Sequence, residues 1–189
     1  MHQNRAWRSA AGSGCASRRS SQFALPVRKV LIFGNSGAGK STLARQIAAD
    51  EGLAHLDLDT IAWEKGDPPQ RTPLEDAGAV IDKFMEAHIG WVIEGCYADL
   101  IELVLPQSPE IIFLDLPVED CIANARARPW EPHKYESPEA QDANLAMLIE
   151  WISQYPERDG VFSREAHATL FREYPGKKKI VTSNRRYEN

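Results

Sequence analysis

The chain has 189 residues, of which 43% are hydrophobic, and it carries 22 basic and 27 acidic side chains. This length suits one well-buried domain, and no hydrophobic run approaches the ~20 residues of a membrane-spanning helix. The three cysteines are far apart and form no C-x-x-C pair. Their spacing excludes a disulfide framework and a structural zinc site, and it favours a reducing cytoplasm.

The charge is unevenly distributed along the chain. Residues 1–28 hold five arginines and no acid, which leaves 17 basic and 27 acidic residues, a net charge of −10, in the rest. This net negative charge argues against nonspecific binding to nucleic acid, whose phosphates it would repel. Residues 1–27 are interpreted as a basic leader and residues 28–189 as the folded domain. The leader is a transit peptide, a disordered arm, or translated upstream sequence before a native start at Val27; we favour the last two.

The first predicted elements are a buried strand over residues 30–33 and a helix over residues 42–49. The eight residues between them, GNSGAGKS, fit the phosphate-binding pattern G-x-x-x-x-G-K-[ST]. A glycine-rich turn at a helix N-terminus lets backbone N–H groups converge on phosphate oxygens. We therefore expect a nucleoside triphosphate here, with Lys40 on the β- and γ-phosphates and Ser41 on Mg²⁺. The expected nucleotide-binding residues are Gly34, Asn35, Ser36, Gly37, Ala38, Gly39, Lys40, Ser41 and Thr42.

A second strand is predicted over residues 54–58, leading into Asp59. Because side chains alternate along an extended chain, Asp57 and Asp59 would share one side. At the carboxyl end of a strand that side can face a ligand, so one carboxylate could hold Mg²⁺ through water and the other accept a proton. The alternative is a pair of solvated turn acids.

A polar loop over residues 63–71 precedes a predicted helix. Thr72 would cap this helix, Pro73 would take its first position and Glu75 would complete a capping box. Its expected apolar stripe is Leu74, Ala77, Ile81, Phe84, Met85 and His88. His88 is interpreted as a packing or capping residue.

Two further strands are predicted over residues 91–95 and 111–115, with Glu94 and Asp115 at their carboxyl ends. A short helix over residues 97–105 separates them, and another begins at Pro117. This second helix delivers Arg126 and Arg128 to the base of a proline-containing loop over residues 129–137. An arginine there could neutralise a transferring phosphoryl group; the alternative is a surface arginine on the last helical turn.

The remaining pattern predicts one long helix from residues 137–138 to 155, a helix over residues 162–174 and a fifth strand over residues 179–182. Alternating strands and helices indicate a single α/β domain with a parallel sheet.

Four stretches, KVLIFGNSGAGKSTLA, HLDLDTIAW, WVIEGCYADL and IIFLDLP, resemble the adenylate-kinase-like P-loop phosphotransferases. The likeness covers about residues 28–184 and is greatest to the DNA topology modulation proteins, with shikimate and gluconate kinases as relatives. It implies a three-layer α/β/α P-loop fold with five parallel strands in the order 2-3-1-4-5 and a short lid.

The same resemblance implies roles for individual residues. It places Mg²⁺ near Asp57 and Glu94, the acceptor at Asp59, a lid arginine at Arg128 and the adenine ring at Asn184. The sequence departs from the residue patterns of adenylate and shikimate kinases at Asn124 and at Glu94-Gly95-Cys96, so the resemblance does not identify the acceptor.

The expected function is an ATP- and Mg²⁺-dependent kinase acting on a small hydroxylated or nucleotide-like acceptor. Lys40, Arg126 and Arg128 would spread charge and Asp59 would activate the acceptor, with Trp63 and Arg71 in the acceptor wall. The alternative is a nucleotide-dependent regulatory or DNA-associated ATPase module. We expect a cytoplasmic monomer or homodimer that binds neither membrane nor, given its charge, nucleic acid.

Overall fold

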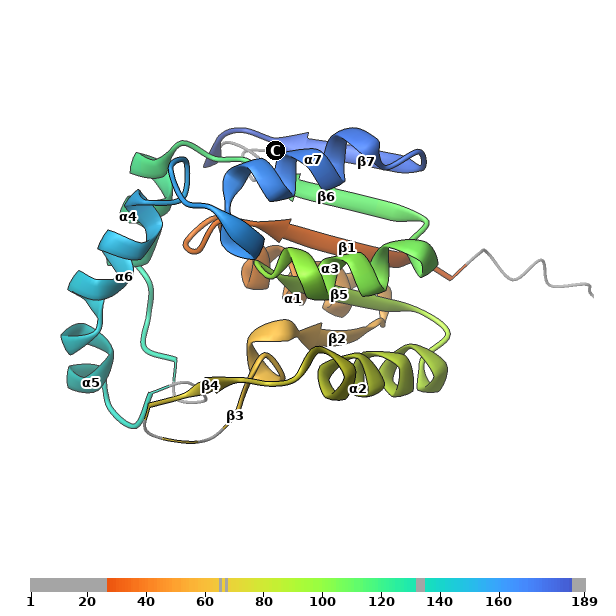
Figure 1. The fold of residues 1–189 in the computed structure, drawn as a ribbon, viewed down its shortest axis with the longest axis horizontal. Helices are drawn as coiled ribbons and strands as arrows, with labels where there is room; N and C mark the ends of the chain where they lie inside the picture. Colours follow the sequence, from red (N-terminus) through yellow and green to blue (C-terminus); the bar gives the residue numbers. More distant parts are fainter. Residues whose placement is uncertain (1–26, 65, 67, 132–134, 185–189) are drawn as a thin grey trace, which may run out of the picture.

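The computed structural model describes residues 27–64, 66, 68–131 and 135–184. The predicted leader therefore lies outside the described residues, apart from Val27. The described residues form a five-stranded parallel sheet with helices on both faces (Figure 1). Its strands are β1 (Lys29–Gly34), β2 (Ala54–Asp57), β5 (Trp91–Gly95), β6 (Glu110–Leu114) and β7 (Lys177–Val181). The α-helices are α1 (Lys40–Glu51), α2 (Leu74–Ala87), α3 (Ala98–Val104), α4 (Val118–Arg126), α5 (Pro138–Ala143), α6 (Leu145–Ser153) and α7 (Arg164–Glu173).

The strand order is β2-β5-β1-β6-β7, and every neighbouring pair in the sheet is parallel. This confirms the predicted order 2-3-1-4-5. Strand β1 is central, with Val30 opposite Val92 on one side and opposite Glu110 on the other. Its apolar residues are fully buried, as expected for a strand that is covered on both faces.

Two apolar cores, one on each face of the sheet, make the fold three-layered. On one face Leu31, Phe33 and Phe113 pack against α2, α3 and α7. On the other face Val30, Ile32 and Ile112 pack against α1, α4 and α6. Side chains of successive strand residues enter opposite cores because they alternate along an extended chain.

The carboxyl ends of the strands lie at the left of Figure 1, where α4, α5 and α6 gather. The β1–α1 loop emerges at this edge, between neighbours whose connections run in opposite directions along the sheet. Such a topological switch point is where open α/β sheets bind ligands.

The second strand is shorter than expected because it ends at Asp57. The Asp57 side chain accepts a hydrogen bond from the Asp59 backbone N–H at 2.9 Å, which starts the 3₁₀ turn η1 (Leu58–Thr60). The expectation that Asp57 and Asp59 share one side of an extended strand is therefore wrong. Leu58 is buried in the core instead, beneath Gly95.

The predicted loop over residues 63–71 contains a small antiparallel hairpin, β3 (Trp63–Glu64) and β4 (Gln70–Arg71). The following helix begins without the predicted capping box, since Pro73 takes the N-cap position. Thr72 instead donates its backbone N–H to the Ala62 carbonyl, which keeps it extended. Leu74 is exposed rather than part of the apolar stripe, whereas His88 follows the last turn and contacts the Phe84 carbonyl through Nδ1.

The long helix predicted from residue 138 to 155 is two helices, α5 and α6, divided at Asn144. The Asn144 side chain donates to the Ala140 carbonyl at 2.8 Å and so competes with the backbone ladder at this point. Ser137 caps α5 as expected, accepting from the Ala140 N–H.

The helix predicted over residues 162–174 begins later, at Arg164, with Ser163 as its N-cap and Phe162 in the preceding 3₁₀ turn η3 (Gly160–Phe162). A third 3₁₀ turn, η2 (Leu105–Gln107), follows α3.

None of the helices in the described ranges combines the length and the hydropathy that a bilayer crossing requires.

Candidate active site

The β1–α1 loop is held in a conformation that depends on glycine. Gly37 and Gly39 have φ angles of 73° and 82°, in the left-handed region. A Cβ on Gly37 would lie 2.3 Å from the Cys121 carbonyl oxygen, so the loop approaches α4 more closely than any other residue permits. The loop thus turns tightly enough to present its backbone N–H groups at the start of α1.

Polar side chains fasten this loop to its neighbours. Asn35 is buried and donates from Nδ2 to the Ile152 carbonyl of α6 at 3.1 Å. Asn124 of α4 donates from Nδ2 to the Gly37 carbonyl at 2.9 Å and to Asn184 Oδ1 at 3.1 Å. Lys40 Nζ donates to the Asn35 carbonyl at 3.0 Å, so its ammonium group lies across the mouth of the loop.

A cavity of about 580 Å³ opens in front of this loop, within the range of small-molecule sites. The loop and the first turns of α1 form its floor, and Asp59 and Cys96 line it from the ends of β2 and β5. Residues from the end of α4 and the following loop form the opposite wall. The lining includes Ser36, Gly37, Gly39, Lys40, Ser41, Thr42, Arg45, Asp59, Cys96, Asn124, Arg128, Trp130, Glu131 and Tyr135.

The predicted nucleotide-binding residues divide into two groups. Ser36, Gly37 and Gly39 to Thr42 line the cavity. Gly34, Asn35 and Ala38 do not; they shape the loop from behind and are buried. Asn184 is not among the lining residues and reaches the site through its hydrogen bond to Asn124, which does line the cavity.

Only one of the two predicted arginines lines the cavity. Arg128 lines the cavity, its Nη1 pairs with Glu131 Oε2 at 3.0 Å, and its buried Nε has no hydrogen-bond partner among the described residues. Arg126 is exposed on the last turn of α4 and does not line the cavity. Asp115, the other acid at a strand end, is held by Arg164 through contacts of 2.8 and 2.5 Å and lies outside the cavity.

Of the candidate metal ligands, Ser41 lines the cavity, whereas the carboxylates of Asp57 and Glu94 are not among its lining residues and lie on the α1 face of the sheet. Asp57 and Glu94 are register partners on β2 and β5, and Glu94 shares its face with Val92, which packs in the core beneath α1. Glu94 is 1% exposed, and its Oε1 has no hydrogen-bond partner within the described part of the chain. His55 Nε2 lies 3.7 Å from that oxygen.

These residues fit a hard divalent cation that keeps several waters, for which one or two carboxylates, a hydroxyl and phosphate oxygens suffice. The described residues contain no group of three or more His, Cys, Asp or Glu side chains that could hold a metal without such help. The buried Glu94 Oε1, which accepts no hydrogen bond from the described residues, is the observation that favours a cation here.

Two titratable side chains near Asp59 stay protonated. Burial raises the pKa of the Cys96 thiol to about 12, and the positive charge of Lys40 only partly opposes this effect. Burial also raises the pKa of Tyr97, whose hydroxyl donates to Asp59 Oδ1 at 2.7 Å. Cys96 is therefore a neutral wall residue rather than a nucleophile, and Tyr97 remains a hydrogen-bond donor.

Sequence reasoning missed several residues of this site. The sequence pattern assigns Tyr97 only to a helix start, although a tyrosine two residues after a strand end at the predicted functional edge is a usable signal. Glu131 and Tyr135 were named only within a loop range. Arg158 stacks on Trp151, with 3.4 Å from its Cζ to the ring centroid, and these two residues line a recess shared with Ser36 and Cys96. Their position depends on α6 and η3 folding back over the loop, which no local pattern reveals.

No protein-family model matches the sequence, and a comparison with curated proteins gives no match either. Solved structures that are similar include an unliganded sugar kinase from a Janibacter species, at 16% identity and a TM-score of 0.46, with 83% of this chain and 86% of that chain covered. They also include a shikimate kinase from Bacteroides thetaiotaomicron, at 18% identity and a TM-score of 0.49, with 82% and 86% covered. Likenesses of this level assign neither a substrate nor a residue role, and the resemblance to the DNA topology modulation proteins stays a prediction.

Proposed function

We propose that this protein is an ATP- and Mg²⁺-dependent kinase that transfers the γ-phosphoryl group to a small hydroxylated or nucleotide-like acceptor. The observation that carries the proposal is the convergence on one cavity of Lys40, Arg128 and Asp59, which come from three separate elements. Phosphoryl transfer requires cations around the phosphates and a group that positions the attacking hydroxyl, and these residues supply both.

In the proposed reaction the triphosphate lies along residues 34–41, with backbone N–H groups and the start of α1 facing its oxygens. Lys40 leaves the Asn35 carbonyl for the phosphates, and Arg128 neutralises charge from the opposite wall. The acceptor hydroxyl attacks the γ-phosphorus, its proton passes to Asp59, and ADP leaves. Ser41, Asp57 and Glu94 would hold Mg²⁺, which supplies further neutralisation of the phosphates when bound.

We also propose, on the quoted motifs, that the chain belongs with the DNA topology modulation proteins among the adenylate-kinase-like phosphotransferases. A cytoplasmic monomer or homodimer remains our expectation. The second candidate, a nucleic-acid-associated ATPase, rests on the basic leader, which lies outside the described residues apart from Val27, and on the lysine run over residues 177–179. Within that run, Lys178 donates to three backbone carbonyls at the end of α7, and Lys177 pairs with Glu110 at 3.1 Å, so both side chains have structural partners.

The test is a panel of hydroxylated metabolites and nucleotides incubated with the purified protein and Mg-ATP. We expect one acceptor class to accelerate ADP formation and to yield a phosphorylated product by mass spectrometry. Lys40→Ala should abolish transfer, whereas Lys83→Ala, on the exposed face of α2, should not. ADP formation at one rate with and without every acceptor would overturn the kinase proposal.

A further inference from the structure

Two hydrogen bonds join the candidate base to the β3–β4 hairpin. Trp63 Nε1 donates to the Tyr97 hydroxyl oxygen at 3.0 Å, and the Tyr97 hydroxyl donates to Asp59 Oδ1 at 2.7 Å. The directions are fixed by chemistry, because an indole N–H can only donate and a carboxylate can only accept. The Tyr97 oxygen therefore accepts a hydrogen bond from the indole N–H, and the Tyr97 hydroxyl donates its own hydrogen bond to Asp59.

Trp63, Tyr97 and Asp59 form a hydrogen-bond relay, and its middle residue, Tyr97, is held rigidly. Tyr97 is 4% exposed, and its ring packs edge-on against Phe162, with centroids 5.4 Å apart. The guanidinium of Arg71 contacts both rings, with Cζ 4.8 Å from the Tyr97 centroid and 5.4 Å from the Phe162 centroid. Arg71 is itself held by Asp99 at 2.8 Å, so the phenol has little freedom to move away from Asp59.

The two ends of the relay differ from the middle. Trp63 is 41% exposed and lies on a two-residue strand, opposite Arg71 in the hairpin. Asp59 is exposed on a single 3₁₀ turn, where an aspartate has several accessible rotamers. A charge-assisted hydrogen bond from a fixed phenol selects one of these rotamers.

We propose that Tyr97 is a positioning residue for the Asp59 carboxylate, and that Trp63 makes the β3–β4 hairpin part of the catalytic apparatus by fixing the Tyr97 hydroxyl. This inference rests on the proposed kinase function for its kinetic consequence, but the relay itself does not. Displacement of the hairpin would remove the indole donor from the Tyr97 oxygen, so the Tyr97 hydroxyl would no longer be held toward Asp59 Oδ1. When the Asp59 carboxylate no longer holds the orientation that the attacking hydroxyl needs, turnover falls. The binding of a nucleotide that is held by other residues is not weakened.

The kinetic test compares Tyr97→Phe, Trp63→Phe and the double variant with wild type. We expect Tyr97→Phe to lower kcat by about 10- to 100-fold with KM for ATP changed less than about 2-fold. Trp63→Phe should lower kcat by a smaller factor, and the double variant should be no slower than Tyr97→Phe alone, because Trp63 acts through Tyr97. Tyr174→Phe, which removes a hydroxyl bonded to the Ser108 carbonyl far from the cavity, is the matched control and should retain wild-type kcat.

A second measurement does not need activity. In a ¹H–¹⁵N spectrum the Trp63 indole signal, assigned by its loss in Trp63→Phe, should shift in Tyr97→Phe and also in Asp59→Asn. It should stay in place in Tyr174→Phe. Wild-type protein that transfers no phosphate to any acceptor contradicts the proposed function, whereas an indole signal unmoved in both site variants contradicts the relay. Additive kinetic losses in the double variant, or a Tyr97→Phe protein as fast as wild type, would likewise overturn the positioning role.

Discussion

Arg128 and Glu131 form an ion pair across the rim of the cavity, with 3.0 Å between Nη1 and Oε2. The loop that carries them is fastened by Gln141 of α5, which is 9% exposed. Gln141 accepts from the Glu131 N–H at 2.9 Å and donates to the Pro129 carbonyl at 3.2 Å. Partly buried hydrogen bonds on both sides of Trp130 thus hold the loop that places Arg128 in the same cavity as Lys40.

This geometry predicts that Arg128→Ala lowers kcat by about 10²- to 10³-fold, because a cation facing the phosphates is lost. Arg128→Lys should recover part of the loss, since it keeps the charge but not the planar donor fork. Steady-state kinetics with the acceptor found in the panel measure both effects, and Arg172→Ala on the exposed face of α7 is the control. Arg128→Ala turning over at the rate of the control would contradict a role in transfer.

The Glu94 carboxylate predicts a measurable metal dependence. Glu94→Gln preserves the shape of the side chain but removes the charge that favours a cation, so we expect the Mg²⁺ concentration for half-maximal activity to rise by about 10-fold or more. Asp82→Asn, exposed on α2, serves as the control. Chelation with EDTA should stop transfer by wild type, and restored Mg²⁺ should recover it. Unchanged Mg²⁺ titrations in Glu94→Gln would remove this residue from the metal site.

Much of the fold and half of the site follow from local patterns. Buried apolar strands and the glycine-rich turn between residues 33 and 42 are local features, and they predict the parallel sheet and the tight β1–α1 turn that the structure shows. Two of the errors arose where a side chain competes with the backbone: Asp57 ends its strand and Asn144 divides a helix, and both do so by a hydrogen bond to a backbone group of a nearby residue. Tyr97 and Arg158 reach the site only through tertiary packing, which periodicity cannot express.

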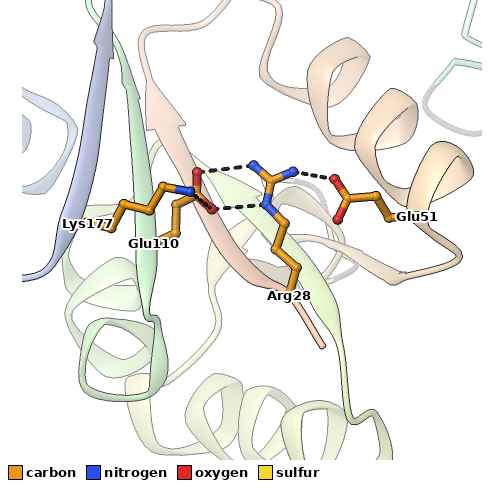
Figure 2. A network of polar contacts seen from close by, with 4 residues as sticks. All are labelled: Arg28, Glu51, Glu110 and Lys177. Atoms are coloured by element: carbon orange, nitrogen blue, oxygen red, sulfur yellow. Dashed lines mark hydrogen bonds and ion pairs between the residues drawn. The ribbon is translucent and has the colours of Figure 1, made fainter. Parts of the chain in front are cut away.

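A network at the opposite edge of the sheet predicts a stability effect without a functional one. Glu110 at the start of β6 is bonded by Arg28 Nε at 3.0 Å and pairs with Lys177 at 3.1 Å, and Arg28 also pairs with Glu51 (Figure 2). Burial raises the pKa of Glu110, but the hydrogen bonds from Arg28 and Lys177 outweigh it, so the pKa lies below its ordinary value. The charged carboxylate is therefore the form that stabilises the fold.

Glu110→Gln should lower the free energy of unfolding at pH 7 by about 1–2 kcal/mol, because Lys177 loses its ion-pair partner and Arg28 keeps only Glu51. A depressed folded-state pKa gives a contribution that is present above the unfolded pKa and lost as the pH falls through the folded value. The difference between wild type and variant should therefore shrink below about pH 4. Urea unfolding at several pH values measures it, with Glu102→Gln, exposed on α3, as the control. A difference that does not vary with pH would exclude the carboxylate charge as its source.

His167 lies fully buried between the sheet and the end of α6. Its Nε2 contacts the Cys96 carbonyl at 3.2 Å, and its Nδ1 contacts the Tyr155 hydroxyl at 2.6 Å, with the Phe33 and Phe113 rings alongside. Burial, assisted by the positive charge of Lys40, lowers the pKa of His167 from 6.5 to about 3. The imidazole is therefore neutral in the folded protein at neutral and mildly acidic pH.

In the unfolded chain the same imidazole binds a proton near pH 6.5, so below that pH the unfolded state binds more protons than the folded state. Stability is then fully present above the unfolded pKa and is lost as the pH falls toward the folded value, by up to ~1.4 kcal/mol per pH unit. We expect wild type to lose about 2 kcal/mol between pH 6 and pH 4.5 from this group. His167→Gln, less stable at pH 7 because it disturbs a packed core, should show a flatter dependence over this window in urea unfolding. His88→Gln retains His167 and should keep the wild-type slope; parallel slopes in all three proteins would show that His167 titrates alike in both states.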